Sequence, residues 1–178
     1  MKKILYLVRH GQTDFNKTHR LQGTKFNESL NEQGVKEIQD CLRNLPRDIE
    51  VVFSSDLERS LSSAKIISSH FNKPLVIREE LRERDFGSLA GKTWDEIPSG
   101  RELQSLDKAL AYDYRPYGGE SVQDATARLE KFLNELRASK YETAVAVTHN
   151  GIFRLAHKLL KEQHIAGVEN ASAHKFEV

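Results

Sequence analysis

Short apolar runs alternate along this chain with longer segments whose apolar residues follow helical spacing. The runs are rich in Val, Ile, Leu and Tyr, which is typical of buried strands. Alternating strands and helices favour an α/β fold in three layers, with a mostly parallel central sheet and helices on both faces. The predicted strands are Lys3–Val8, Glu50–Ser54, Pro74–Arg78, Thr143–Val147 and Ala173–Val178.

Helical spacing between these runs predicts helices whose starts are marked by capping residues. The helix after the second strand has a well-marked start, because Ser55 and Glu58 stand as in a capping box. Asn31, Ser121 and Gly151 mark the starts of the others. The predicted helices cover Val35–Leu45, Leu57–Ile67, Val122–Leu136 and Ile152–Leu160.

Residues 83–120 do not fit this alternation. They contain breakers such as Pro98-Ser99-Gly100 and Gly118-Gly119, with one short helical pattern at Leu103–Leu110. Long insertions inside compact domains commonly form lids or binding loops. We therefore expect residues 84–120 to cap the functional site.

The length of 178 residues suits one domain, 1–178, with a core large enough to fold without disulfides. The net charge is only +1, so it gives no reason to expect nucleic acid or a membrane surface as a partner. The single Cys41 cannot form an internal disulfide, and the apolar run near the N-terminus is too short for a signal peptide or a membrane span. We expect a cytoplasmic protein, and the sequence leaves its oligomeric state open.

Cationic side chains follow several of the predicted strands. Arg9-His10-Gly11 ends the first strand, Arg59 lies in the first turn of the helix after the second, and His149-Asn150-Gly151 follows the fourth. Ligands of open α/β sheets bind beyond the carboxyl ends of the strands, so these residues should converge. Arginine forks match phosphate oxygens, and helix N-termini favour anions. The sequence therefore predicts a phosphate site.

Histidine adds reactivity to such a site, because a neutral imidazole is a nucleophile for phosphorus. Neighbouring guanidinium groups lower the pKa of His10 and stabilise charge on the transferred oxygens. A departing alkoxide needs a proton, and Glu83 lies just after the third predicted strand. A phosphate dianion beside it would raise the pKa of Glu83 and keep part of the population protonated. Glu83 is the candidate acid and base.

The segment "LVRHGQTDFN", residues 7–16, resembles the signature of the histidine phosphatase superfamily, which includes the cofactor-dependent phosphoglycerate mutases. The blocks "SSDLERSLSSA", "LRERDFGSLAGKTWDEI", "YGGES" and "VTHNG" follow in that family's order and approximate spacing. The resemblance runs from residue 4 to about residue 178 and implies a phosphoglycerate mutase-like fold.

The resemblance also implies roles for individual residues. It makes His10 the phosphorylated nucleophile and Glu83 the proton donor. It implies that a segment near the substrate includes Gln22 and Gly23. The implied phosphate contacts are Arg9, Arg59, His149 and Asn16.

Two departures from the family pattern stand out. Asn31 replaces the usual threonine before the first helix, which changes a cap, and Ser62-Ser63 replace a common Gln-Thr pair after Arg59. We expect neither departure to touch the five central residues.

"GSLAGKT", residues 87–93, is not a nucleotide-binding P-loop, because the spacing of its glycines is one residue too short. The remaining histidines lack metal-ligand spacing, so no metal is expected.

Hydrolysis and phosphoryl transfer within a sugar acid both begin with a phosphohistidine. The family's mutases carry extra segments around the site, whereas only residues 84–119 separate Glu83 from Glu120 here. We therefore expect a metal-independent, cofactor-free phosphomonoesterase acting on a small phosphorylated metabolite, such as a sugar phosphate or an α-ribazole-phosphate-type ester. Phosphoglycerate mutase-type transfer is the alternative. A catalytically quiet phosphate-binding module is a third interpretation, but a binder needs neither a nucleophile nor an acid.

Overall fold

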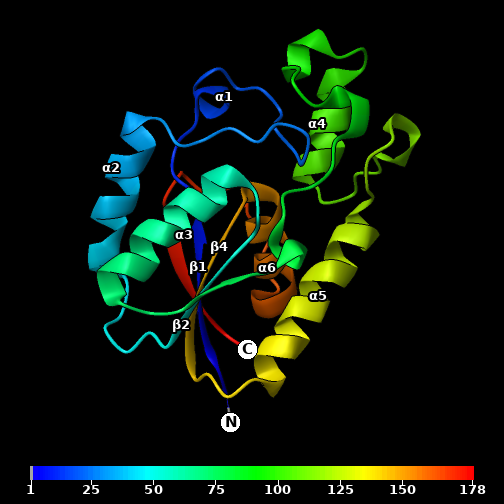
Figure 1. The fold of residues 1–178 in the computed structure, drawn as a ribbon. Coiled ribbons are helices and arrows are strands. Elements are labelled where there is room, and N and C mark those ends of the chain that lie inside the picture. Colours follow the sequence, from blue (N-terminus) through cyan, green and yellow to red (C-terminus); the bar gives the residue numbers. More distant parts are fainter. Residues whose placement is uncertain (1) are drawn as a thin grey trace.

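The computed structural model describes residues 2–178, in which one sheet lies between two layers of helices (Figure 1). The order across the sheet is β3-β2-β4-β1-β5. Neighbours among the first four are parallel, and β5 runs antiparallel to β1. The predicted α/β fold with a mostly parallel sheet is confirmed. The strands are β1 (Ile4–Arg9), β2 (Val51–Ser54), β3 (Leu75–Ile77), β4 (Thr143–Thr148) and β5 (Ala173–Glu177).

Alternate strand residues point to opposite faces of the sheet, and each face carries its own buried cluster. Val8 packs with Ile38 and Ile67 beneath α2 and α3, whereas Leu7 belongs to the cluster that includes Leu129 and Ile152 of α5 and α6. Figure 1 shows these two helix pairs on either side of the strands. The four helices are α2 (Glu32–Cys41), α3 (Glu58–Phe71), α5 (Val122–Ala138) and α6 (Asn150–Lys161).

Two further helices lie beyond the carboxyl ends of the parallel strands, at the top of Figure 1. These are α1 (Asp14–Lys17) and α4 (Gly100–Lys108), the second of which accounts for the short helical pattern in the expected cap. Buried Ile97 and Tyr112 join segment 84–120 to the same hydrophobic cluster as the sheet. The 3-10 turns of the chain are Leu42–Asn44, Glu79–Leu81, Gly87–Leu89, Trp94–Glu96 and Arg115–Tyr117.

The predicted helix starts are confirmed at two helices and wrong at α3 and α6. In α6, His149 is the N-cap and Gly151 lies inside the helix. Asn31 accepts a hydrogen bond from the Gly34 N–H at 2.9 Å, and Ser121 forms a capping box at α5. Helix α3 begins at Glu58, and the Ser55 side chain makes no cap there. Ser55 is drawn away because its hydroxyl bonds to His149, a tertiary contact that competes with the local pattern.

No helix among residues 2–178 has both the length and the apolar character needed to cross a bilayer.

Candidate active site

The carboxyl ends of β1, β2 and β4 bring the predicted site residues together. Arg9 ends β1 and His10 follows it, while Arg59 lies in the first turn of α3. His149 is the N-cap of α6, directly after β4, and Glu83 follows the 3-10 turn after β3. The His10 and His149 rings lie 5.1 Å apart between centroids, and the charges of both arginines act on His10. The five residues therefore form one cluster, in which four are buried and Arg9 is half-buried.

His10 is poised as a neutral base with one free ring nitrogen. Its Nδ1 lies 2.8 Å from the carbonyl oxygen of Gly11. A carbonyl only accepts, so Nδ1 carries the proton and the lone pair is on Nε2. Burial, with only 3% of the residue exposed, lowers the pKa of His10 well below its ordinary value, and the charges of Arg59 and Arg9 lower it further. An uncharged imidazole with a bare Nε2 is the form that can attack phosphorus.

His149 is fully buried beside His10. Its Nε2 lies 2.8 Å from the Ser55 hydroxyl, and its Nδ1 has no hydrogen-bond partner among the described residues. Burial, then the charges of Arg59 and His10, hold its pKa well below the ordinary range. Buried polar atoms are nearly always bonded, so the unpartnered Nδ1 is a candidate contact for a ligand.

Both arginines are held by backbone carbonyls and form no ion pair within 4.0 Å among residues 2–178. Arg59 donates to the Gly23 carbonyl at 2.7 Å and to the Phe26 carbonyl at 3.0 Å, and Arg9 donates to the Val168 carbonyl. The Nε atoms of both are buried without a partner in that range. Burial lowers the pKa of Arg59 to about 10. Buried cations that lack a carboxylate partner favour an anionic ligand.

Glu83 lies close enough to this cluster for its charge to act on Arg9 and Arg59. Its Oε1 accepts the Arg84 N–H at 2.9 Å, and its Oε2 accepts the Gly151 N–H at 3.1 Å. Burial acts to raise the pKa of Glu83, but the Arg84 charge and the two backbone N–H groups outweigh it, so the pKa is lowered. A bound phosphate dianion is still expected to raise the pKa of Glu83, against the opposing effect of Arg84, which the sequence does not reveal. A Cβ at position 151 would overlap both Glu83 and Arg84, so only glycine fits there.

The remaining predicted residues lie around the cluster. Asn16 closes the capping box of α1, where its Oδ1 accepts the Thr13 N–H at 3.1 Å. Gln22 is buried and donates from Nε2 to the Thr13 hydroxyl at 2.7 Å. The Gly23 carbonyl is fixed by Arg59. Thus Asn16, Gln22 and Gly23 all belong to the segment that covers the arginines.

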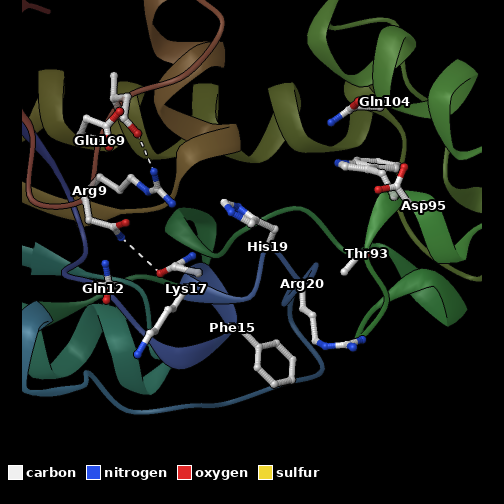
Figure 2. A pocket seen from close by; sticks show the side chains of 14 residues that line it. Arg9, Gln12, Phe15, Lys17, His19, Arg20, Thr93, Asp95, Gln104 and Glu169 are labelled. Atoms are coloured by element: carbon white, nitrogen blue, oxygen red, sulfur yellow. Dashed lines mark hydrogen bonds between the residues drawn. The ribbon is translucent and has the colours of Figure 1, made fainter.

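A pocket of about 850 Å³ opens beside Arg9 and Asn16 (Figure 2). Its walls come from α1 and the following turn, from the 84–120 segment, and from residues 168–170. In Figure 2 His19 stands between Arg9 on one side and Gln104 of the cap segment on the other. Polar side chains dominate the lining, which suits a polar molecule attached to a phosphate.

Sequence reasoning missed several supporting residues. The Ser63 hydroxyl accepts the Gly11 N–H at 3.1 Å and donates to the Arg59 carbonyl at 2.7 Å, so the expectation that position 63 does not touch the central residues is wrong. Ser55 holds His149, as described above, and Arg84 lies against Glu83. The local pattern around a serine near a helix start predicts an N-cap. A single sequence gives no indication that the hydroxyl instead bonds to a residue far away along the chain. Among residues 2–178, no three His, Cys, Asp or Glu side chains cluster as a metal site would require.

One family of known proteins matches nearly the whole chain. The family model of the histidine phosphatase superfamily (branch 1) matches residues 5–178. The chain belongs to the histidine phosphatase superfamily. The resemblance read from the motifs is thereby confirmed.

Relatives in the superfamily include both mutases and phosphatases. A 2,3-bisphosphoglycerate-dependent phosphoglycerate mutase of Methylobacterium radiotolerans is 34% identical over 136 residues, which cover 72% of this chain and 64% of the mutase. A metal-independent phosphoserine phosphatase of Arabidopsis thaliana is 32% identical over 169 residues, covering 92% of this chain and 71% of the phosphatase. The structure of a mycobacterial glucosyl-3-phosphoglycerate phosphatase with VO3 has a TM-score of 0.85 at 28% identity, covering 97% of this chain and 92% of that one. Two of these three similar proteins are named as phosphatases and one as a mutase.

Proposed function

We propose that this protein hydrolyses the phosphomonoester of a small phosphorylated metabolite through a phosphohistidine on His10. One observation carries the proposal: a buried, neutral His10 with its Nε2 lone pair free lies near the buried Arg59 and the half-buried Arg9, and neither guanidinium has a carboxylate partner among residues 2–178. Phosphate supplies the missing negative charge, and the imidazole supplies the nucleophile.

In the first step, Nε2 of His10 attacks phosphorus and the ester P–O bond breaks. Arg9, Arg59 and His149 bind the phosphoryl oxygens, on which charge accumulates. Glu83 gives its proton to the departing oxygen, so the product leaves as an alcohol. Glu83 carries that proton because the bound phosphate dianion offsets the influence of Arg84 and raises the Glu83 pKa.

In the second step, water attacks the phosphorus of phosphohistidine and the P–N bond breaks. The Glu83 carboxylate accepts a proton from this water, which returns the acid to its starting form. Inorganic phosphate leaves and His10 is neutral again. The cycle needs no metal ion, and the relative described as a metal-independent phosphoserine phosphatase supports this part of the proposal.

The rest of the substrate occupies the pocket beside Arg9, whose lining includes Asn16, the proposed phosphate contact. Gln22 and Gly23 do not line this pocket, and their proposed place is beside the substrate near Arg59, which binds the Gly23 carbonyl. Segment 84–120 forms the outer wall as a cap of the single domain. The polar lining favours a small hydrophilic metabolite, of which phosphoserine and a sugar phosphate are examples of suitable size.

Phosphoglycerate mutase-type transfer is the second candidate, and the 34% identity to a mutase favours it. The short 84–119 segment favours hydrolysis, because a mutase must keep its intermediate away from water. Interconversion of 2- and 3-phosphoglycerate, dependent on a bisphosphate primer, is the measurement that identifies a mutase.

Hydrolysis of an aryl phosphate by chelator-treated protein tests the proposal. With an aryl ester that carries a labelled phosphate, the wild type should release labelled phosphate. After rapid alkaline quenching, part of the label should remain bound to the protein. The His10→Ala variant should neither release phosphate nor retain the label. If wild type and variant are equally inactive on several phosphoesters between acidic and neutral pH, the phosphatase proposal fails.

A further inference from the structure

Arg84 is a buried arginine that touches the carboxylate of Glu83. Its Nε lies 3.4 Å from Glu83 Oε1, and its Nη1 donates to Asp107 Oδ1 in α4. The guanidinium is also stacked between rings, 5.0 Å from the centroid of Phe86 and 5.3 Å from that of Tyr112. Ring contacts and a carboxylate partner together leave Arg84 a single orientation.

Asp107 connects three parts of the molecule. Besides Arg84, it accepts a hydrogen bond from the Tyr114 hydroxyl at 2.8 Å and one from Arg154 Nη1 of α6 at 2.9 Å. Arg154 also donates to the Asp107 backbone carbonyl. Through Asp107, cap helix α4 is fixed both to α6 and to the loop that carries Glu83.

The charges of this cluster balance. Glu83 and Asp107 are the two anions, Arg84 and Arg154 are the two cations, and all four residues are at most 8% exposed. Removing one member of a buried ion pair leaves an uncompensated charge, which is strongly unfavourable. The cluster therefore favours an ionised Glu83 held in one place.

We propose that Arg84 is a positioning residue that fixes where the Glu83 carboxylate points and when it takes up a proton, and that Asp107 holds Arg84 in that position. Cap helix α4 thereby acts on the proton donor without touching the substrate's phosphate. The inference rests on the proposed role of Glu83 and adds residues to it.

Other charged groups also face Glu83, and the test leaves them unchanged. Arg59 of α3 and Arg9 of β1 lie across the phosphate site with His10 and His149. From α5, Arg128 donates to the Glu83 backbone carbonyl at 3.1 Å while paired with Glu120 at 2.7 Å. The neighbouring Arg82 is paired with Asp56.

Two substitutions should move the Glu83 pKa in opposite directions. Arg84→Met removes the adjacent cation, and the pKa should rise by about 1–3 units. Asp107→Asn keeps an amide oxygen that can accept the hydrogen bond from Arg84 and so keeps Arg84 in place. It removes the negative charge that offsets Arg84, and the pKa of Glu83 should fall. A loosened site would let water in and move both variants toward the ordinary value. Opposite shifts are therefore a signature that structural damage does not produce.

The Glu83 pKa can be read without turnover by carbon-13 NMR of protein labelled at glutamate carboxyls, with the signal assigned by Glu83→Gln. Arg115→Gln is the matched control, because Arg115 is an exposed cap cation paired with Asp113, and the pKa of Glu83 should not change. The phosphatase pH profile should shift with the NMR values. If Arg84→Met does not fold, two milder variants replace it. Arg84→Lys preserves the positive charge and should keep the Glu83 pKa low, and the near-isosteric Asp107→Asn should lower that pKa further.

Shifts in the same direction, or none, overturn the inference even if the wild type hydrolyses phosphoesters. Opposite shifts in a protein that hydrolyses nothing would support the positioning contact and refute the proposed function. The two failures are therefore distinguishable.

Discussion

Replacing Glu83 by glutamine removes the exchangeable proton of the proposed acid while keeping the shape of the side chain. Both carboxylate oxygens accept backbone N–H groups, at 2.9 and 3.1 Å. A glutamine offers only one acceptor, so its NH₂ must face one of these N–H donors. An unsatisfied buried donor costs about 1–3 kcal/mol. Glu83→Gln should therefore lower the free energy of unfolding by that amount while leaving the fold intact.

The effect on catalysis depends on the leaving group. Loss of a general acid slows reactions with poor leaving groups by roughly 10²- to 10⁴-fold, which is about 2.7–5.4 kcal/mol of activation free energy. An alkyl phosphate should show this loss, whereas a nitrophenyl phosphate, whose phenolate leaves without a proton, should lose less in the first step. Affinity for vanadate should not weaken, because the substitution removes an anion beside Arg9 and Arg59. Glu130→Gln, on the exposed face of α5, is the matched control and should match wild type in both assays.

The comparison is made as kcat/KM on the two esters, with circular dichroism to verify folding at the assay temperature. An unchanged rate on the alkyl ester would remove Glu83 from the mechanism. Equal losses on both esters, together with weaker vanadate binding, would mean that the side chain acts by holding the phosphate site together.

Three further outcomes follow from the site. Gly151→Ala should lower the free energy of unfolding by about 1–3 kcal/mol, because the added Cβ overlaps Glu83 and Arg84. Thermal unfolding should show the loss of stability, and the ester assay should show a loss of activity. Vanadate at 100 times its Kd should raise the free energy of unfolding of the wild type by about 2.7 kcal/mol. The same vanadate concentration should not stabilise Arg59→Met. Equal stabilisation of this variant would mean that the anion binds elsewhere. Folding lowers the pKa of His10 and His149 below their ordinary value of 6.5, so the unfolded state binds more protons and stability should fall as pH drops below about 6.5. Denaturant titrations at pH 5 and pH 7 that gave equal free energies would contradict this.

The positions of the strands along the chain and the convergence of the cluster could be predicted because they follow from local signals. Arg9, His10 and His149 directly follow or end apolar runs, and parallel strands direct their carboxyl ends to one edge of the sheet. The capping box at Ser55 failed for the complementary reason. The residues match the capping-box pattern, but the Ser55 hydroxyl forms a hydrogen bond with His149 instead. Local spacing does not indicate such a long-range partner.

The cap could be located from its breakers but not described. Asp107 lies 23 residues from Arg84 and 47 from Arg154 along the chain, and nothing in the charge run around Glu83 distinguishes Arg84 from its solvated neighbours. Burial decides the difference: Arg84 is 4% exposed, whereas Arg82 is half-buried and pairs with Asp56. Which of two similar arginines turns inward depends on the packing of α4, which one sequence does not reveal.

In the proposed mechanism, the charge of the substrate brings in the proton that catalysis needs. Both histidines are neutral and Glu83 is balanced within its cluster with Arg84, Asp107 and Arg154, so Arg9 and Arg59 leave two positive charges for a phosphate dianion. The bound dianion lies close to Glu83, and its repulsion raises the Glu83 pKa so that the carboxylate takes up a proton. The dianion thus recruits the proton that its own leaving group receives. Arg84 opposes this uptake while the pocket holds no anion, which keeps Glu83 ionised until a phosphate has entered.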